Sequence, residues 1–520
     1  MYHYKVILSA LCASLLSTQL FSAISIAQDT TTDQIASGPT DRGFFIETLS
    51  GMIADLNNFV FAKVTLFGTE VNWIVLVLMA PMIFLTLYLG FINLRGFKLA
   101  SKVVRGHYHD PNAPGEVTQF QALSTALSGT VGLGNITGVA MAIYIGGPGA
   151  TFWMIVIGLF AMTLKFAEVT LSLKFRDVHH DGTVSGGPMY YLDKGLRSKG
   201  QNWRLIGKIL AWSYAILAIP SLLQIAQVNQ SYSLINYVTG FESDAAPWVF
   251  GVIVAILTAA VIAGGIRSIA GVTSRLVPLM CGIYLIAALF ILLTHFDQIG
   301  TAFGVIFQGA FAPDAAYGGI IGVLVIGMKR AVYSTEAGLG SATIAHAAAK
   351  TNEPVSEGMV ALMEPFIDTV VVCTITALVI IISGAYIVPA GADVNAFHIT
   401  SQAFGSKISW FPYVLAFAAL LFAFSTIISW GYYISKIWGF VFGEGKNSMR
   451  IFKFVYCIAL IPGAALHPTE VIDLMDSMFF LMAIPNVIGI FIMAPILKRE
   501  LKSYLQRIQS GEIKETRHES

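Results

Sequence analysis

Glycine, hydroxyl and amide residues interrupt an apolar, membrane-length segment between Phe120 and Ile145. The interruption reads LSGTVGLGNITG from Leu127 to Gly138. A glycine costs a helix about 1 kcal/mol relative to alanine, and unwound backbone in lipid leaves N–H and C=O groups unpaired. This composition favours a helix that opens toward a protein cavity, where half-helix N-termini hold anionic groups and freed carbonyls hold cations. The segment is therefore predicted to form half of a solute and ion site.

A second string of the same kind, YSTEAGLGS from Tyr333 to Ser341, interrupts the apolar segment 319–345. If the helix at 120–145 is the first of a core, this segment is the sixth, so the two interrupted helices run in opposite directions. One glycine-rich interruption is more typical of close helix packing. Two at corresponding positions of antiparallel halves predict an inverted-repeat transporter with its site between the repeats.

The composition indicates an all-α polytopic membrane protein. The 520 residues are 56% hydrophobic and 12% charged, whereas a soluble domain has about 25% charged residues. The net charge of +1 gives no indication of a nucleic-acid partner, and no obligate protein partner is evident. Cys12, Cys281, Cys373 and Cys457 stand singly in apolar runs, which is typical of buried small residues.

The N-terminus resembles a secretory signal peptide over residues 1–27. Lys5 precedes a short apolar core, and Ser25-Ile26-Ala27 forms a small-residue cleavage site. An uncleaved extra helix is the alternative. Residues 28–70 are then expected to form an extracytoplasmic segment.

Apolar windows predict about eleven transmembrane helices, since each is long enough to cross a bilayer. An extra helix at 71–93 precedes a five-plus-five inverted-repeat core with broken first and sixth helices. The first repeat is expected at 120–295, the second at 319–497, and a tail at 498–520. The windows lie at 71–93, 120–145, 151–173, 209–235, 247–265, 276–295, 319–345, 358–382, 410–434, 452–466 and 471–497.

Lysine and arginine are concentrated in every second loop. Runs of them occupy 95–105, 174–208 and the tail, whereas the alternate segments hold only Arg42, Lys63 and Lys407. The positive-inside rule then predicts a cytoplasmic C-terminus in a plasma membrane, the inner membrane of a bacterium.

The connecting segments are short, so no soluble catalytic domain is expected between the spans. The longer outer segments, 296–318 and 383–409, are predicted to be gate-side loops or short interfacial helices. The inner loop around SGGPMYY at 185–191 has turn residues and is predicted to be a folded elbow.

Four long strings resemble the alanine or glycine:cation symporter family, within the amino acid–polyamine–organocation superfamily. They are TALSGTVGLGNITGVAMAIYIGGPGATFWM from Thr125, GGPMYYL at 186–192, STEAGLGSATIAHAAAKT at 334–351 and FIDTVVVCTITALVI at 366–380. The resemblance covers about 95–500. It implies sodium-coupled import of a small neutral amino acid such as alanine, glycine or serine, with the sodium ion as coupling ion and no other cofactor.

A zwitterionic amino acid needs donors for its carboxylate and acceptors for its ammonium. N–H groups at 132–134 start a half-helix and would take the carboxylate, while carbonyls at 128–130 would take the ammonium. Polar amides on the third core helix either touch substrate or bond between helices, and a tryptophan on the eighth either shapes the pocket or anchors the interface. The predicted substrate-binding residues are Ser128, Gly129, Thr130, Gly132, Leu133, Gly134, Gln227, Asn229, Ser334, Thr335 and Trp430.

Sodium prefers five or six oxygen ligands, like other hard cations, and the resemblance implies two shells. Thr335 departs from the family motif, which more often has asparagine there. Serine and threonine pairs in membrane helices otherwise bond back to their own helix. One shell comprises Thr130, Asn135, Thr335 and Asp368 or Thr369; the other comprises carbonyls near Ser128 and Val131 with Ser425 and Thr426.

Three intramembrane charges are predicted to be structural or gating groups. Lys165 and Glu168 are three residues apart on one helix and are expected to pair. Glu336 lies within the second interruption, where a carboxylate would hold opened backbone, neutralise a cation or take up a proton.

Competing functions are distinguished by other features. A proton-coupled symporter would use Glu336 or Asp368. An enzyme is not expected, because the chain has no HExxH or GxSxG motif. Two closed half-helix sites favour alternating access over the continuous pore of a channel.

Overall fold

The structure is a computed structural model of the chain. It describes residues 41–66, 69–108, 110, 112–222, 224–240, 243–311, 319–387, 396–408, 410–465 and 469–515. The predicted signal peptide at 1–27 and the end of the tail lie outside these residues.

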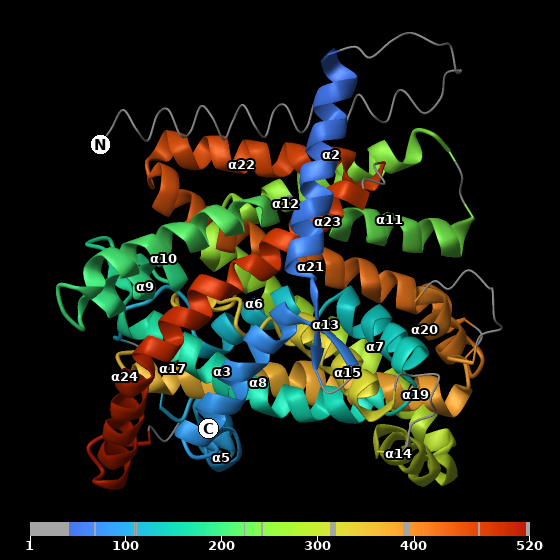
Figure 1. The fold of residues 1–520 in the computed structure, drawn as a ribbon, viewed down its shortest axis with the longest axis horizontal. Helices are drawn as coiled ribbons and strands as arrows, with labels where there is room; N and C mark the ends of the chain where they lie inside the picture. The colour runs from blue at the N-terminus through green and yellow to red at the C-terminus, as the bar shows by residue number, and fades with distance from the viewer. Residues whose placement is uncertain are drawn as a thin grey trace.

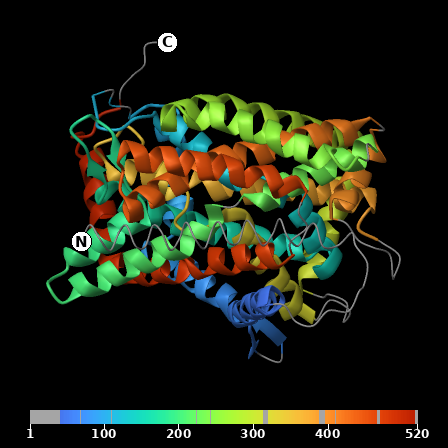
Figure 2. The ribbon, with the colours of Figure 1, turned by 90° about the horizontal axis from the view of Figure 1, so that it is seen from above.

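The segment before the core contains a helix and a hairpin. Helix α2 (Asp41–Val60) packs against α23 (Thr469–Leu481) and lies at one edge of the bundle, across the direction of the long helices (Figures 1 and 2). Strands β1 (Lys63–Leu66) and β2 (Thr69–Asn72) pair antiparallel. Helix α3 (Trp73–Tyr88) corresponds to the predicted extra transmembrane helix, but it has only 16 residues, too few to cross a bilayer of ordinary thickness without local thinning.

Long helices make up the rest of the chain and run side by side (Figures 1 and 2). The part of the chain that the structure describes has six helices long and apolar enough to span a membrane, or seven if one bent pair of helices is counted as a single span. Other predicted spans are shorter helices. The elements are α6 (Gln119–Thr130), α7 (Leu133–Gly146), α8 (Ala150–Lys174), α10 (Trp203–Ala218), α11 (Ile225–Thr239), α12 (Ala246–Ile262), α13 (Gly265–Thr294), α15 (Gly319–Thr335), α16 (Thr343–His346), α17 (Pro354–Ala361), α18 (Met363–Pro365), α19 (Thr374–Ser383), α21 (Phe411–Phe442), α22 (Lys446–Leu460), α23 and α24 (Ala483–Gln509).

Two groups of helices enclose the interrupted ones. Helix α8 packs against α15 and α17, while α13 and α21 pack against α6. Between α18 and α19 the chain forms a π-helix, η3 (Phe366–Cys373). π-helical turns are rare and frequently mark functional sites.

The connecting segments contain short folded elements. Helices α14 (Phe296–Phe311) and α20 (Ala396–Gly405) lie in the two longer segments that the sequence predicts to be outside. The predicted elbow consists of strands β3 (Asp177–Val178) and β4 (Val184–Ser185), which pair antiparallel, followed by α9 (Pro188–Arg197). Two further short helices, α4 (Ile92–Arg95) and α5 (Phe97–Val104), follow α3.

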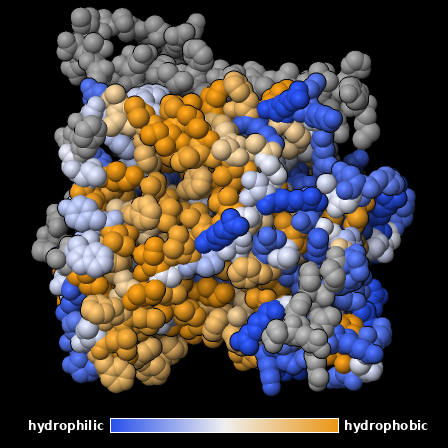
Figure 3. Space-filling model, turned by 180° about the vertical axis from the view of Figure 1, so that it is seen from behind, coloured by the Kyte–Doolittle hydropathy of each residue, from blue (hydrophilic) through white to orange (hydrophobic). Residues whose placement is uncertain are grey.

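The surface of the molecule has a broad apolar area. Figure 3 shows apolar residues over the middle of one face and polar residues gathered at the end where α5, α9 and α24 lie in Figure 1. Exposed large apolar side chains on α13 include Leu279, Ile286, Phe290 and Leu293. Such an extended apolar surface is typical of contact with lipid.

Candidate solute and cation site

The first interruption is a break between two helices. Helix α6 ends at Thr130, Val131 and Gly132 are extended, and α7 begins at Leu133. The two helices meet at an angle of 45°, with α6 in the left half and α7 in the right half of Figure 1. This confirms the predicted interruption, because the helix ends and restarts within the string of glycine, hydroxyl and amide residues.

Asn135 holds the start of α7. Its Oδ1 accepts a hydrogen bond from the Gly132 backbone N–H at 3.0 Å, so one of the three N–H groups expected to bind carboxylate is already occupied. Gly134 is exposed, and an added Cβ there would meet nothing within 4 Å. A solute therefore has access to the positive end of α7.

The second interruption is also confirmed. Helix α15 ends at Thr335 and α16 begins at Thr343. Between them Glu336, Gly338 and Gly340 adopt positive φ angles of 50°, 96° and 75°. A positive φ is uncommon for a residue with a side chain and indicates strain.

The two breaks meet at Asp368, which lies on η3. The Asn135 amide donates to Ser334 Oγ at 3.1 Å and to Asp368 Oδ1. The Ser334 hydroxyl also donates to Asp368, and Thr369 Oγ1 donates to Asp368 Oδ2 at 2.7 Å. All four side chains are buried. We call Asn135, Ser334, Asp368 and Thr369 the carboxylate cluster.

A second group of oxygens joins α6 to α21. The Ser128 carbonyl oxygen accepts from Thr426 Oγ1 at 3.0 Å and from Ser425 Oγ at 3.4 Å. Both hydroxyls also donate to Phe422 O, as expected for hydroxyls on a helix. Ser429, which the sequence reasoning missed, bonds to Ser128 Oγ; its spacing of four residues from Ser425 is the signal that places it on the same face.

Other predicted ligands make local contacts. Thr130 Oγ1 lies 3.4 Å from the carbonyls of Ala126 and Leu127. The Thr335 hydroxyl donates to Ala331 O at 2.9 Å and accepts from Ala337 N at 3.3 Å, so it caps the end of α15. Within the part of the chain that the structure describes, no hydrogen bond joins Val131 or Gly129 to a polar side chain of either group, although a Cβ at Gly129 would lie 3.0 Å from the Tyr433 hydroxyl.

The predicted residues Gln227 and Asn229 on α11 and Trp430 on α21 differ in their contacts. Helix α11 packs against α21. The Gln227 Oε1 is buried and has no hydrogen-bond partner among the residues that the structure describes, whereas Asn229 has a partner. Trp430 is buried, and its ring centre lies 5.6 Å from that of Tyr433 and 5.7 Å from that of Phe479.

The intramembrane charges differ from the prediction. Lys165 forms its ion pair with Glu364, at 3.4 Å, so the predicted pairing of Lys165 with Glu168 is wrong. Glu168 instead accepts from Gly338 N at 3.1 Å and from the Asn486 amide at 2.7 Å. Positions three residues apart allow contact, but the opened backbone of the second break offers Glu168 donors that have no helical partner.

Glu336 and a buried histidine complete the charged interior. Glu336 Oε2 accepts from the Ser341 hydroxyl at 2.6 Å, across the second break, which agrees with a structural role. His346 Nδ1 lies 2.6 Å from Glu357 Oε1, and Gln119 donates to Glu357 at 2.9 Å. The positions of His346 and Glu357 in the sequence did not predict this contact.

Arg176 joins three segments near the charged end of the bundle. Its guanidinium donates to four carbonyls, those of Pro114, Ala347, Ala349 and Thr351, at 2.6–2.8 Å. Burial lowers the pKa of the Arg176 guanidinium to about 10, so it stays charged at neutral pH.

Comparison with known proteins identifies the family. The sodium:alanine symporter family matches residues 54–518. The chain belongs to this family. Curated relatives match it over 81–96% of their own length.

Named relatives include transporters for different amino acids. The sodium/alanine symporter AgcS of Methanococcus maripaludis is 38% identical over 444 residues, which cover 85% of this chain and 96% of the relative. The probable sodium/glutamine symporter GlnT of Bacillus subtilis is 30% identical, with 84% and 89% covered. Among solved structures, MhsT in complex with L-phenylalanine has a TM-score of 0.51 at 15% identity, over 73% of this chain and 89% of that chain. That likeness concerns the fold alone.

Proposed function

We propose that this protein imports a small neutral amino acid together with sodium by alternating access. The proposed substrate is alanine, with glycine and serine as further candidates of similar size. The observation that carries the proposal is the meeting of both helix breaks at one buried carboxylate, Asp368. Antiparallel broken helices that face each other are the arrangement in which transporters hold substrate and coupling ion.

The amino acid would lie between the breaks. Its carboxylate would accept from the N–H groups of Leu133 and Gly134, at the exposed start of α7. Its ammonium would bond to carbonyls at 128–130 and to Gln227 Oε1, whose lack of a partner is otherwise costly. Trp430 would close the pocket.

Sodium would bind at the two oxygen groups. In the carboxylate cluster, Asp368 supplies charge, and Ser334 and Thr369 supply neutral oxygens. Asn135 donates its amide N–H into the cluster and would supply its Oδ1 only if the amide turned over. At the other group, the Ser128 carbonyl with Ser425 and Thr426 offers the oxygen ligands that a hard cation prefers. Thr130, Val131 and Thr335 would join only if their local bonds rearranged.

The proposed topology has eleven spans in the inner membrane. The extra helix precedes two inverted repeats, at 120–295 and 319–497, and the tail at 498–520 is cytoplasmic. The distribution of lysine and arginine supports this orientation, and the end of the bundle near Arg176 is then the cytoplasmic end.

Uptake by the purified protein in proteoliposomes tests the proposal. Radiolabelled alanine, glycine, serine and glutamine are each offered with an inward gradient of sodium, lithium or choline. We expect alanine uptake in sodium only, and its loss in Asp368→Asn. Uptake that is equal in choline would contradict sodium coupling, and a preference for glutamine would contradict the substrate.

Proton coupling is the second candidate. A relative from Bacillus subtilis is named a putative sodium/proton-dependent alanine carrier, and Asp368 and Glu336 are buried acids between the breaks. If protons drive transport, a pH gradient alone will drive alanine uptake in sodium-free medium, and Glu336→Gln or Asp368→Asn will abolish it.

A further inference from the structure

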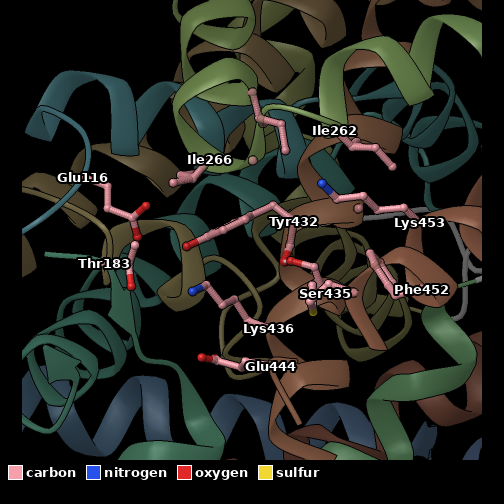
Figure 4. Close-up of a pocket in the computed structure, with 14 residues that line it drawn as sticks. Glu116, Thr183, Ile262, Ile266, Tyr432, Ser435, Lys436, Glu444, Phe452 and Lys453 are labelled. Atoms are coloured by element: carbon pink, nitrogen blue, oxygen red, sulfur yellow. The ribbon is translucent and has the colours of Figure 1, made fainter. Parts of the chain in front are cut away.

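A cavity of about 260 Å³ lies between α13, α21, α22 and the β3–β4 hairpin. Liquid water would fill it with roughly nine molecules. It lies beyond the breaks along α21: its lining on that helix runs from Gly431 to Lys436, five to ten residues past Thr426, or about 8–15 Å along the helix. Figure 4 shows the side chains of Glu116, Thr183, Tyr432 and Lys436 on one side of the cavity and that of Lys453 on another.

The charges that line the cavity are not paired with one another. Lys436 Nζ donates to Val184 O at 2.8 Å and lies 3.3 Å from Ser185 Oγ, and Lys453 Nζ donates to Ala263 O at 2.9 Å. Among the described residues, neither ammonium has a carboxylate oxygen within 4.0 Å, and Glu116 has no basic nitrogen within that distance. Each lysine thus keeps its charge available for an anion, and Glu116 keeps its charge for a cation.

The rest of the lining suits a small zwitterionic molecule, which has one positive and one negative group. Two lysines and two glutamates, the second being Glu444, leave no net charge in the cavity. The opposite wall is apolar and includes Ile266, Ile269 and Phe452. A free amino acid has this chemistry: a carboxylate for a lysine, an ammonium for a glutamate, and a short apolar side chain for the wall.

We propose that this cavity is a second amino-acid site, which does not require sodium. The inference rests on the proposed function for the choice of alanine as ligand and for the orientation of the chain. Glu116 belongs to the segment that leads into α6, whereas Lys436 belongs to α21. An amino acid held between them ties the first broken helix to α21, so cytoplasmic substrate at high concentration slows import.

Binding measurements on the purified full-length protein test the proposal. Equilibrium dialysis with radiolabelled L-alanine is done in sodium and in choline. We expect the wild type to keep a weaker binding component in choline. Lys436→Met and Glu116→Gln each weaken this component about tenfold, since each removes a charge-assisted hydrogen bond, and leave the sodium-dependent component in place.

Two further variants separate this inference from the proposed transport function. Lys446→Met, at an exposed lysine of the same helix as Lys453, is the matched control and leaves both components unchanged. Asp368→Asn removes the sodium-dependent component alone. If choline abolishes all binding, or if both Lys436→Met and Glu116→Gln bind as the wild type does in choline, the second site does not exist. If the wild type binds alanine in choline but shows no additional binding in sodium, the transport proposal is contradicted instead.

Discussion

At the scale of single residues, Asn135 connects the two helix breaks through its hydrogen bonds. Its oxygen holds the Gly132 N–H, while its amide reaches Ser334 and Asp368. An aspartate in its place would accept the first bond but would set a second carboxylate against Asp368. The amide is therefore the group that satisfies a donor and an acceptor at once.

Asn135→Ala should raise the sodium concentration for half-maximal uptake by about tenfold or more, because unsatisfied buried partners cost roughly 1–3 kcal/mol. Sodium titration of alanine uptake measures this. Asn93→Ala is the matched control: Asn93 is also buried and donates to Leu159 O at 2.8 Å, away from the site. An equal shift in both variants would indicate general destabilisation.

Thr426→Val should weaken sodium dependence, whereas Thr426→Ser should retain it. Valine keeps the shape but removes the hydroxyl that contacts the Ser128 carbonyl at 3.0 Å. Sodium titrations of both variants, compared at equal protein content, give the answer. Normal sodium affinity in Thr426→Val would exclude this oxygen group as a sodium site.

At the scale of elements, composition predicted where helices break but not what holds the breaks open. Glycine and hydroxyl residues in apolar segments predicted both helix breaks, because such residues raise the free energy of a lipid-facing helix. The clamp of Glu168 and Asn486 on Gly338 depends on packing between α8 and α24. Contacts between helices distant in sequence leave no periodic signal, which is also why Lys165 was assigned the wrong partner.

Gly338→Ala should destabilise the protein by about 1–3 kcal/mol, through a strained backbone. Its φ is 96°, and an added Cβ would lie 2.5 Å from Leu78 Cδ2. Thermal unfolding in detergent will show a lower midpoint. Gly304→Ala on α14 is the control, since a Cβ there meets nothing within 4 Å; equal midpoints for the two variants would argue against the strained break.

At the scale of the whole molecule, the charged end of the bundle is tied across the two breaks. Val117, just before α6, forms a parallel bridge with Ala349, just after α16. Lys350 N donates to Val117 O at 2.8 Å, and Arg176 covers the same junction. The two broken helices therefore share one end, and we expect that end to move as a unit when access changes sides.

Arg176→Lys should loosen this junction, because one ammonium cannot reproduce a guanidinium that bonds to four carbonyls. Hydrogen exchange of the Lys350 amide should become about tenfold faster or more, as the loss of charge-assisted bonds predicts. Arg197→Lys, at an exposed position on α9, is the control. Unchanged exchange in Arg176→Lys would show that the bridge alone secures the junction.

The π-helix η3 has a consequence for how the site tolerates insertion and deletion. A turn closed by i→i+5 hydrogen bonds carries one residue more than an α-helical turn, so the helical segment from α18 to α19 contains a surplus residue beside Asp368. Removing one residue after Thr369, such as Val371, would let the chain relax into an ordinary α-helix. The span would survive this shortening, while Cys373 and everything beyond it would rotate away from Ser334. The irregular turn thus sets the angular phase between Asp368 and the part of its own helix that follows Cys373.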